Sequence, residues 1–460
     1  MTGPDLSLTT GAETAAALDA GDPLAPFRDE FCLPVGRDGS PQIYLAGNSL
    51  GAAPRAAVGA VQAELERWAR LGVAGHVAGE SAWAPYHELL TEPLARLVGG
   101  RPHEVVAMNS LTVNLHLLTV SFYEPTADRH KILIEEHAFP SDHFAVESQI
   151  RQRGGDPAES LVLARPRPGE ETLRSGDLLD LIAGHGGELA LVLLPGVQYY
   201  TGQVLPMAEI TAVAQEAGAR VGFDLAHAVG NVPLALHDWN VDFAVWCSYK
   251  YLNAGPGAVG GAFVHERHVR DRSLPKLLGW WGQRKAIRFE MATVFDPIPT
   301  VESWQLSNPP ILAMAPLRAS LDVFDAAGGV AALRAKSQQQ IRYLDYLLAE
   351  VLDDRIESIT PVDLAERGCQ HSLRVRVPGV EGRAVYEALK DADVACDWRS
   401  PDVIRVAPVP LYNSFADIRR FVGVLDGAQT QAGRRAPEDR AAPSSAYAPG
   451  RAGAGRRSTR

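Results

Sequence analysis

Between residues 130 and 265, short apolar runs alternate with longer segments, and this alternation constrains the fold more than any other feature of the chain. The runs span residues 132–134, 161–163, 189–194, 221–223, 243–247 and 262–264. Most segments between them are long enough for a helix or a crossover, and residues 178–182 and 207–217 have apolar side chains at helical spacing. Strand–helix alternation of this kind predicts an α/β layered fold with a mainly parallel sheet.

The flanking segments predict further parts. Residues 54–71 have the pattern of an amphipathic helix opened by Pro54, and residues 313–353 that of one or two long helices with a break near Gly328 and Gly329. From about residue 368 the chain predicts a compact α+β domain, with strands at 373–377 and 403–406 and helices at 382–389 and after Ser414. We therefore expect an N-terminal arm (1–40), a large domain (41–320), a long helix with a smaller C-terminal domain (321–428), and a disordered tail (429–460) rich in Gly, Pro, Ala and Arg.

The composition argues against several classes of protein. A hydrophobic content of 46% and a charged content of 22% are typical of a soluble globular protein. The net charge of −11 argues against nucleic acid and anionic membranes as partners. The four cysteines are scattered (Cys32, Cys247, Cys369 and Cys396), and the acidic first thirty residues do not resemble a signal peptide, so we expect a cytoplasmic protein. No apolar run approaches the roughly 20 residues that span a bilayer.

Lysine is rare in this chain, and one lysine stands at the end of a predicted strand. Only six of the 44 Lys and Arg residues are lysine, and Lys250 follows the apolar run 241–247 through Ser248 and Tyr249. We expect the other five, which have charged, Pro or Gly neighbours, at the surface: Lys131, Lys276, Lys285, Lys336 and Lys390. An amine can lose its proton and form an imine, whereas a guanidinium cannot. Lys250 is therefore a candidate catalytic lysine, unless its stem packs on the strand while its charge reaches solvent.

A second predicted strand ends at Asp224, 26 residues before Lys250. If the two strands are neighbours, both side chains lie at one edge of the sheet. This pair suits pyridoxal 5′-phosphate, because the carboxylate keeps the pyridine nitrogen protonated while the lysine binds the aldehyde. Ser110, Leu111 and Thr112 precede an apolar helix at 113–120 and offer its N-terminus to the phosphate. These parts predict a pyridoxal-phosphate enzyme.

Two sequence motifs favour other chemistry. Residues 255–260 fit the GxGxxG pattern of dinucleotide-binding proteins, but they lead into another predicted strand where that motif requires a helix. Residues 47–51 match the GxSxG motif of serine hydrolases, with Ser49 as the nucleophile. Only about forty mostly irregular residues precede Ser49, too few for the strands that supply the oxyanion hole of such an enzyme. A serine hydrolase remains an alternative.

Histidines near acids could be read as metal ligands. His137 and His143 with Asp142, or His265 with His268, are such groups among the thirteen histidines. Neither forms HExxH or a comparable framework, so we expect no metal.

The longer motifs resemble those of one family, the kynureninases, which are fold-type-I pyridoxal-phosphate enzymes of the aminotransferase class V superfamily. The matching segments lie between about residue 40 and residue 425, at 47–51, 111–116, 139–143, 224–231, 248–253, 279–280, 307–310 and 405–410. The resemblance implies hydrolytic Cβ–Cγ cleavage of L-kynurenine or 3-hydroxy-L-kynurenine to an anthranilate and L-alanine, in tryptophan degradation and NAD biosynthesis. It also implies a homodimer with a shared active site.

The resemblance assigns roles to individual positions. Lys250 is implied to bind the cofactor, Asp224 to pair with its pyridine nitrogen, and Tyr249 to donate to its phosphate. The whole implied cofactor set is Leu111, Thr112, Phe139, Pro140, Ser141, Asp142, Asp224, His227, Tyr249, Lys250, Trp280 and Asn308, of which Trp280 and Asn308 come from the partner subunit.

The substrate is implied to contact Ser49, His76, Asn308 and Arg405. Arg405 matches the arginine that binds the α-carboxylate as a bidentate pair, and the other three match the trio at the ring end in relatives that prefer 3-hydroxykynurenine. Pro195 departs from the family, where Ser or Thr usually contacts the cofactor, and this implies weaker cofactor binding.

One related function shares the main residues. A fold-type-I lyase such as a cysteine desulfurase would also use Asp224 and Lys250, but it needs a mobile catalytic cysteine. Cys369 is the candidate for that role, so this alternative stays open at the level of sequence.

Overall fold

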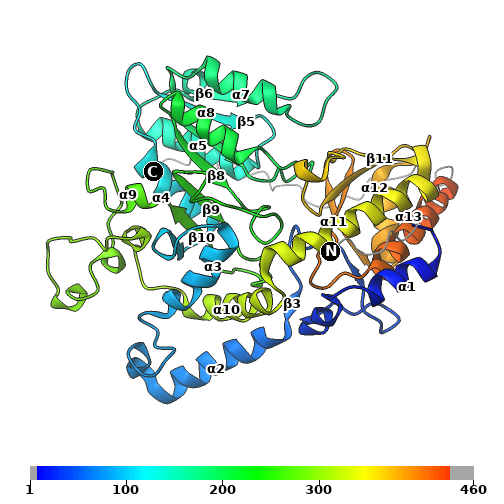
Figure 1. Cartoon of the computed structure of the whole chain (residues 1–460), viewed down its shortest axis with the longest axis horizontal. Coiled ribbons are helices and arrows are strands. Elements are labelled where there is room, and N and C mark those ends of the chain that lie inside the picture. The colour runs from blue at the N-terminus through cyan, green and yellow to red at the C-terminus, as the bar shows by residue number, and fades with distance from the viewer. Residues whose placement is uncertain (1–7, 436–460) are drawn as a thin grey trace, which may run out of the picture.

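A seven-stranded sheet forms the centre of the computed structural model, which describes residues 8–435 (Figure 1). Its strands, in spatial order, are β4 (Val105–Ala107), β10 (Gly261–Val264), β9 (Phe243–Trp246), β8 (Arg220–Asp224), β7 (Leu189–Pro195), β5 (Lys131–Glu135) and β6 (Leu161–Ala164). The five strands from β9 to β6 pair in parallel, and β10 is antiparallel to both β9 and β4. The predicted α/β fold with a mainly parallel sheet is therefore confirmed.

Both faces of this sheet are buried, as expected for parallel strands whose crossovers place helices on each side. In β9, Ala244 and Trp246 belong to one hydrophobic cluster, while Phe243 and Val245 belong to another. The second cluster includes side chains of α4 (Leu111–Phe122) and α5 (Pro140–Gln152). The first includes those of α3 (Thr91–Val98), α7 (Ser175–Gly184), α8 (Met207–Glu216) and α10 (Ile311–Ala326). Alternation along each strand thus directs successive side chains into two separate cores.

A smaller antiparallel sheet lies beside the large one, on the right of Figure 1. Its order is β11 (Ile356–Ser358), β12 (His371–Val375), β15 (Val403–Val406) and β14 (Asp397–Arg399). α11 (Gly329–Leu347), α12 (Gly382–Asp391) and α13 (Phe415–Arg435) share its hydrophobic core. The predicted strand at 373–377 begins two residues earlier, and the prediction missed β11 and β14. On the basis of the two sheets, we propose a large domain over residues 41–320 and a smaller one over residues 321–428.

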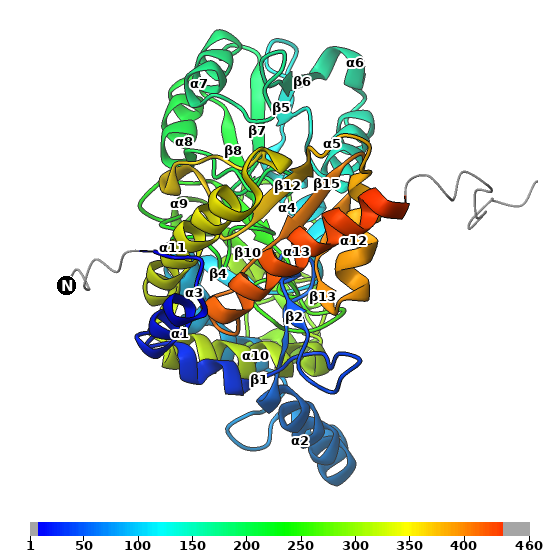
Figure 2. The same cartoon turned by 90° about the vertical axis from the view of Figure 1, so that its right-hand side faces the viewer.

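The N-terminal segment packs on both parts of the molecule. α1 (Ala12–Ala20) lies against α13, and β2 (Ile43–Tyr44) pairs in parallel with β13 (Val394–Ala395). β1 (Phe31–Cys32) pairs with β3 (Ala53–Pro54), which leads into α2 (Arg55–Leu71). α2 packs against α10 and extends away from the body in Figure 2.

The remaining helices and turns are short. α6 (Pro157–Ser160) precedes β6, α9 (Glu266–Val269) follows β10, and short turns occupy much of residues 280–304. The expected break between α10 and α11 is confirmed, since Gly328 and Gly329 have φ of 87° and 72°, which favour glycine. α13 continues to Arg435, so the predicted tail begins with helix and its remainder, residues 436–460, lies outside the described residues. Among the described helices, none combines the length and apolar character that a bilayer crossing requires.

Of the five lysines predicted at the surface, Lys336 is buried and Lys131 and Lys276 are partly buried. The side chain of Lys131 is 20% exposed, and its Nζ lies 3.0 Å from Glu188 Oε1. Lys336 is 5% exposed, and its Nζ lies 2.7 Å from Asp22 Oδ2. Lys276 is partly buried, and its Nζ lies 3.6 Å from the centre of the Trp304 ring. Their partners are distant in sequence, so neighbouring residues did not reveal these contacts.

Candidate active site

The residues predicted from strand ends meet at the carboxyl edge of the large sheet. Asp224 ends β8, Pro195 ends β7, Glu135 ends β5, and Lys250 follows β9 by four residues. This edge is where open α/β sheets bind their ligands. Here it borders a cavity of about 220 Å³ lined by Asn48, Ser49, Leu111, Thr112, Glu135, Phe139, Ser141, Asp142, Pro195, Val197, Tyr199, Asp224, Ala226, His227, Tyr249, Lys250 and Arg399.

Lys250 contacts a buried histidine inside this cavity. Its Nζ lies 2.9 Å from Nε2 of His227. Burial, together with the positive charges of Lys250, Arg405 and Arg399, lowers the pKa of His227 well below its usual range. The imidazole is therefore neutral at physiological pH, and its Nε2 can accept a hydrogen bond from the lysine. Nδ1 of His227 is buried and has no hydrogen-bond partner within the described residues.

Three buried carboxyl groups, those of Glu135, Asp142 and Asp224, line the same cavity as the lysine. Asp224 Oδ1 accepts a hydrogen bond from the backbone N–H of Ala226 at 2.7 Å. Burial raises the pKa of Asp224, and burial and the neighbouring Asp224 raise the pKa of Asp142, in the first turn of α5, well above its usual value. Burial also raises the pKa of Glu135 to about 7, and Glu135 Oε1 accepts from Gln198 at 3.1 Å. Negative charge in this cluster is therefore disfavoured without a positive partner, and a cationic ring nitrogen beside Asp224 would supply one.

Two helix N-termini meet on another side of the cavity. Thr112 in the first turn of α4 and Ser141 in the first turn of α5 place their hydroxyl oxygens 2.8 Å apart. Neither helix has a side-chain cap. In α5, Pro140 has no N–H and the N–H of Asp142 donates to the Phe139 carbonyl at 2.8 Å, so the first turn of α4 and the N–H of Ser141 are the backbone donors available to a ligand. Free N–H groups and two hydroxyls at positive helix ends make an anion site. The Tyr249 ring also lines the cavity, and burial and Cys247 raise the pKa of its phenol, which stays a donor.

An aromatic wall borders the same space. Phe139 is 48% exposed, and its ring meets that of Tyr199 edge to face, with centroids 5.3 Å apart and an interplanar angle of 86°. A planar ring bound in the cavity would have an aromatic face available for stacking.

A buried arginine lies behind the cavity wall. Arg405 donates through Nη1 to the carbonyl oxygen of Tyr199, and through Nη2 to the Asp397 carboxylate and to Ser49 Oγ at 3.2 Å. Asp397 also pairs with Arg399 Nη2 at 3.1 Å. Arg399 lines the cavity, whereas Arg405 lies beneath this first layer of side chains.

The structure brings most predicted site residues together and leaves three apart. His76, Trp280 and Asn308 do not line the cavity of the single chain. Trp280 is 43% exposed, Asn308 is exposed and His76 is partly exposed, with its ring against Trp83. Pro140 is the first residue of α5, between Phe139 and Ser141.

Several cavity residues were not predicted. Asn48 lies in the quoted motif 47–51 and donates to Gln370 Oε1 at 3.0 Å. Glu135 directly follows an apolar run, the same signal that identified Asp224, and so could have been found. Tyr199 and Arg399 carry no such signal. Tyr199 lies in a turn, and Arg399 lies in β14, a short strand that was not predicted.

The alternative chemistries lack their reactive groups. Ser49 donates to Asp397 and accepts from Arg405, so its described contacts supply no histidine base for a serine hydrolase. Cys369 is 2% exposed, and burial raises the pKa of its thiol to about 11, which keeps it unreactive. Residues 255–260 lead into β10 as expected, and not into the helix that a dinucleotide site needs.

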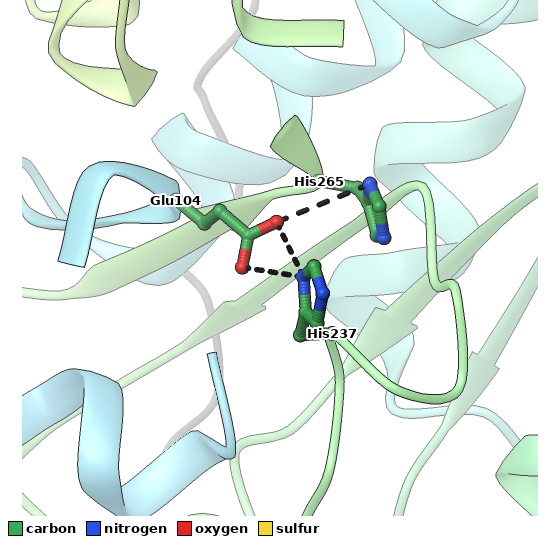
Figure 3. A group of neighbouring side chains, drawn as sticks. All are labelled: Glu104, His237 and His265. Carbon is green, nitrogen blue, oxygen red and sulfur yellow. Dashed lines mark hydrogen bonds and ion pairs between the residues drawn. The ribbon is translucent and has the colours of Figure 1, made fainter. Parts of the chain in front are cut away.

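A group of possible metal ligands lies near the amino-terminal end of β4 and the carboxyl-terminal end of β10, away from the cavity. Figure 3 shows its three side chains. The ligand atoms of Glu104, His237 and His265 lie within 4.8 Å of one another. Glu104 already accepts from the backbone N–H groups of Arg101 and Glu266 at 2.8 and 2.7 Å and lies 2.9 Å from His237 Nδ1. His265 caps α9 through its ring. Because these lone pairs are already engaged, we assign the group a structural role at the ends of short helices.

The cavity fits the cofactor implied by the resemblance. Asp142 Oδ1 and His227 Nδ1 are buried polar atoms without partners in the described part of the chain, and both belong to cavity residues. The uncapped helix ends suit a phosphate, the carboxyl cluster suits a pyridinium nitrogen, and Lys250 suits an aldehyde. Pro195 supplies no hydroxyl at its position, as the sequence indicated.

Comparison with known proteins gives the same picture. Residues 333–425 match a family model described as the kynureninase C-terminal domain. The kynureninase of Myxococcus xanthus (strain DK1622) is 55% identical over 413 residues, which cover 90% of this chain and 96% of that protein. The kynureninase of Xanthomonas oryzae pv. oryzae (strain PXO99A) is 55% identical over 412 residues, which cover 90% and 97%.

Solved structures resemble the fold at lower identity. A cysteine desulfurase from Thermococcus onnurineus NA1 has a TM-score of 0.70 and 17% identity, covering 85% of this chain and 95% of its own. The cystine C–S lyase C-DES, in complex with its product cysteine persulfide, has a TM-score of 0.69 and 20% identity, covering 84% and 97%.

Proposed function

Because the chain belongs to the kynureninase family, we infer that it hydrolyses the Cβ–Cγ bond of L-kynurenine or 3-hydroxy-L-kynurenine. The products are anthranilate or 3-hydroxyanthranilate and L-alanine. The observation that carries this function is 55% identity over 90% of the chain. The buried thiol of Cys369 speaks against the desulfurase alternative, and tryptophan degradation through the kynurenine pathway is the proposed context.

The cofactor is pyridoxal 5′-phosphate, and we propose which residues hold it. When bound, it withdraws electrons from the substrate Cα, a chemistry that no protein side chain supplies. Lys250 would bind the aldehyde, Asp224 the ring nitrogen, and Phe139 the ring face. The first turns of α4 and α5, together with Tyr249, would bind the phosphate; the contacts between Thr112 and Ser141 support this placement.

Proton transfer at Cα falls to Lys250. A neutral Nζ would remove the Cα proton and later return protons to the product. His227 Nε2, 2.9 Å from Nζ, accepts a hydrogen bond from this amine and orients it. The neutral state of His227 prevents a second positive charge from forming beside a protonated lysine.

The net reaction consumes one water. Its hydroxyl adds to the γ-carbonyl carbon and becomes part of the anthranilate carboxylate, while Cβ gains a proton and becomes the alanine methyl group. Arg405 would bind the α-carboxylate as a bidentate pair, since a buried guanidinium retains its charge and presents a fixed fork.

We propose a homodimer in which Trp280 and Asn308 of each chain complete the partner's site. Their exposure in the single chain supports this, because a cofactor-binding tryptophan would otherwise lie in solvent. A cytoplasmic location is proposed from the composition and from the four free cysteines.

Steady-state kinetics with both substrates test this function. Purified protein loaded with cofactor should release anthranilate from kynurenine and 3-hydroxyanthranilate from 3-hydroxykynurenine, each followed by fluorescence. We expect a higher kcat/KM for the hydroxylated substrate, by about ten- to a hundredfold, if His76 and Asn308 pair with its ring hydroxyl. Replacing both by apolar residues should shrink that preference. Equal use of both substrates would contradict the ring-end assignment, and no cleavage of either would contradict the function itself.

A further inference from the structure

Three charged side chains on adjacent strands share one face of the smaller sheet. β14 and β15 pair antiparallel with Asp397 opposite Arg405, and Arg399 is two residues further along β14. Alternation along the strand therefore places Asp397, Arg399 and Arg405 on the same side. Both arginines bond the same carboxylate oxygen, Oδ2 of Asp397.

The carboxylate of Asp397 pairs with the guanidinium of Arg405, the group expected to bind the substrate carboxylate. The side chain of Arg405 is 1% exposed, and its Nη2 is engaged by Asp397 and Ser49 while its Nη1 bonds the Tyr199 carbonyl. A substrate α-carboxylate cannot form a bidentate pair with Arg405 while Asp397 remains in place. The protein thus supplies its own carboxylate at the position where the substrate carboxylate is expected.

Arg399 offers the displaced carboxylate another partner. It lines the cavity, its side chain is 37% exposed, and its guanidinium already contacts Asp397 at 3.1 Å. Nε of Arg399 and Nε of Arg405 are both buried without a hydrogen-bond partner among the described residues. The two arginines therefore have unused donors for one more carboxylate, and their two positive charges match two negative ones.

We propose that substrate binding exchanges carboxylates at this triad. The α-carboxylate of the substrate displaces Asp397 from Arg405, and Asp397 moves onto Arg399, so that every charge stays paired. Asp397 and Arg399 are then positioning residues that act through Arg405. In the absence of substrate, Asp397 balances the buried positive charge of Arg405. A ligand without a carboxylate cannot replace Asp397 there, so its binding is disfavoured. This inference rests on the proposed function, because it takes kynurenine as the ligand.

A double-mutant cycle on the cofactor-loaded enzyme tests the exchange. The probe is 4-(2-aminophenyl)-4-oxobutanoate, which keeps the ring and carboxylate of kynurenine but lacks the amine that reacts with the cofactor. Its inhibition constant and its calorimetric dissociation constant are measured for wild type, Asp397→Asn, Arg399→Gln and the double variant. The carboxamide of the same probe is the matched control ligand.

The exchange predicts a specific pattern. Asp397→Asn should tighten binding by about tenfold or more, because the competing charge-assisted bond is gone. Arg399→Gln alone should weaken binding by about tenfold, because the displaced Asp397 is left unpaired. In the Asp397→Asn background, Arg399→Gln should have little effect, and the carboxamide should respond to neither change. Arg399→Lys, which keeps the charge, should retain wild-type affinity and serves as the check on folding.

Two results would overturn the proposal. If Arg399→Gln weakens binding equally in both backgrounds, Arg399 holds the substrate carboxylate itself. If Asp397→Asn weakens binding or leaves it unchanged, Asp397 only orients Arg405. Cleavage of kynurenine by the wild type in either case would show that the proposed function stands while the exchange fails.

Discussion

The buried acids Asp142 and Asp224 should tolerate the same substitution very differently. Both line the cavity, and each change to Asn removes one ionisable group while keeping the shape of the side chain. Burial and the neighbouring Asp224 raise the pKa of Asp142 well above its usual range, so we expect Asp142 to be the member of the pair that keeps its proton. Burial also raises the pKa of Asp224, but the N–H of Ala226 and the positive charge of Lys250 oppose that rise. Of the two, Asp224 is therefore the one that carries the negative charge.

The magnitudes follow from which group is charged. Asp142→Asn replaces one neutral donor by another, and a neutral hydrogen bond is worth about 1 kcal/mol, so activity should fall by no more than about tenfold. Asp224→Asn removes the charged partner of a buried pyridinium. Breaking a buried ion pair costs about 3–5 kcal/mol, which corresponds to a loss of about 100- to 4,000-fold.

Two measurements separate these outcomes. The kcat for kynurenine is followed by anthranilate fluorescence, and cofactor affinity is measured by titrating the apoenzyme and recording absorbance. Asp224→Asn should retain part of its cofactor affinity through the phosphate contacts while losing turnover. If Asp142→Asn lowers kcat as much as Asp224→Asn, the assignment of the proton to Asp142 is wrong.

Three further predictions concern other parts of the molecule. After borohydride reduction, mass spectrometry should find the cofactor adduct in Lys276→Ala but not in Lys250→Ala. Lys276 is the strictest control because burial lowers its pKa to about 8. An adduct on Lys276 would refute the assignment. Burial raises the pKa of Glu135 from 4.5 to about 7, so the folded protein binds this proton more tightly than the unfolded chain does. The stabilisation from that proton is complete below pH 4.5 and is lost as the pH rises through 7. The free energy of unfolding should fall by about 3 kcal/mol over that window, and Glu135→Gln should flatten the slope in urea unfolding; identical slopes would contradict this. Mixing inactive Lys250→Ala chains with inactive Asn308→Ala chains should restore part of the activity through hybrid dimers, and no recovery despite proven subunit exchange would argue against a shared site.

The central parts of the site could be placed from the sequence because they follow buried strands. Asp224 ends β8 and Lys250 follows β9, and these two strands are neighbours in the sheet. An apolar run identifies such a strand without any tertiary information, and parallel pairing then brings both side chains to one edge. The same reasoning would have given Glu135, which ends β5.

Contacts between distant segments could not be predicted in this way. Lys336 lies in a helix whose sequence looks amphipathic, yet its amine is buried against Asp22 and the carbonyl of Pro410. Burying an ammonium requires partners, and these come from segments far away in the chain. A lysine with charged or small neighbours therefore looks the same in sequence whether it is buried or exposed.

The carboxylate end of the site illustrates this limit most clearly. β14 has three residues, Asp397–Arg399, all partly buried, so it shows neither an apolar run nor a buried alternation. Its position comes from pairing with β15, whose buried residues Val403–Val406 are a recognisable strand. Arg405 is assigned through the resemblance of residues 405–410 to the family, whereas the roles of Asp397 and Arg399 follow only from the register that places them beside it. A shift of one residue in that register would turn the side chains of Asp397 and Arg399 to the opposite face of the sheet, where Trp398 now lies. Arg405 would then be a buried charge without a carboxylate partner. Backbone pairing with β15 sets this register, and the Asp397–Arg405 ion pair, which we propose the substrate replaces, favours it further.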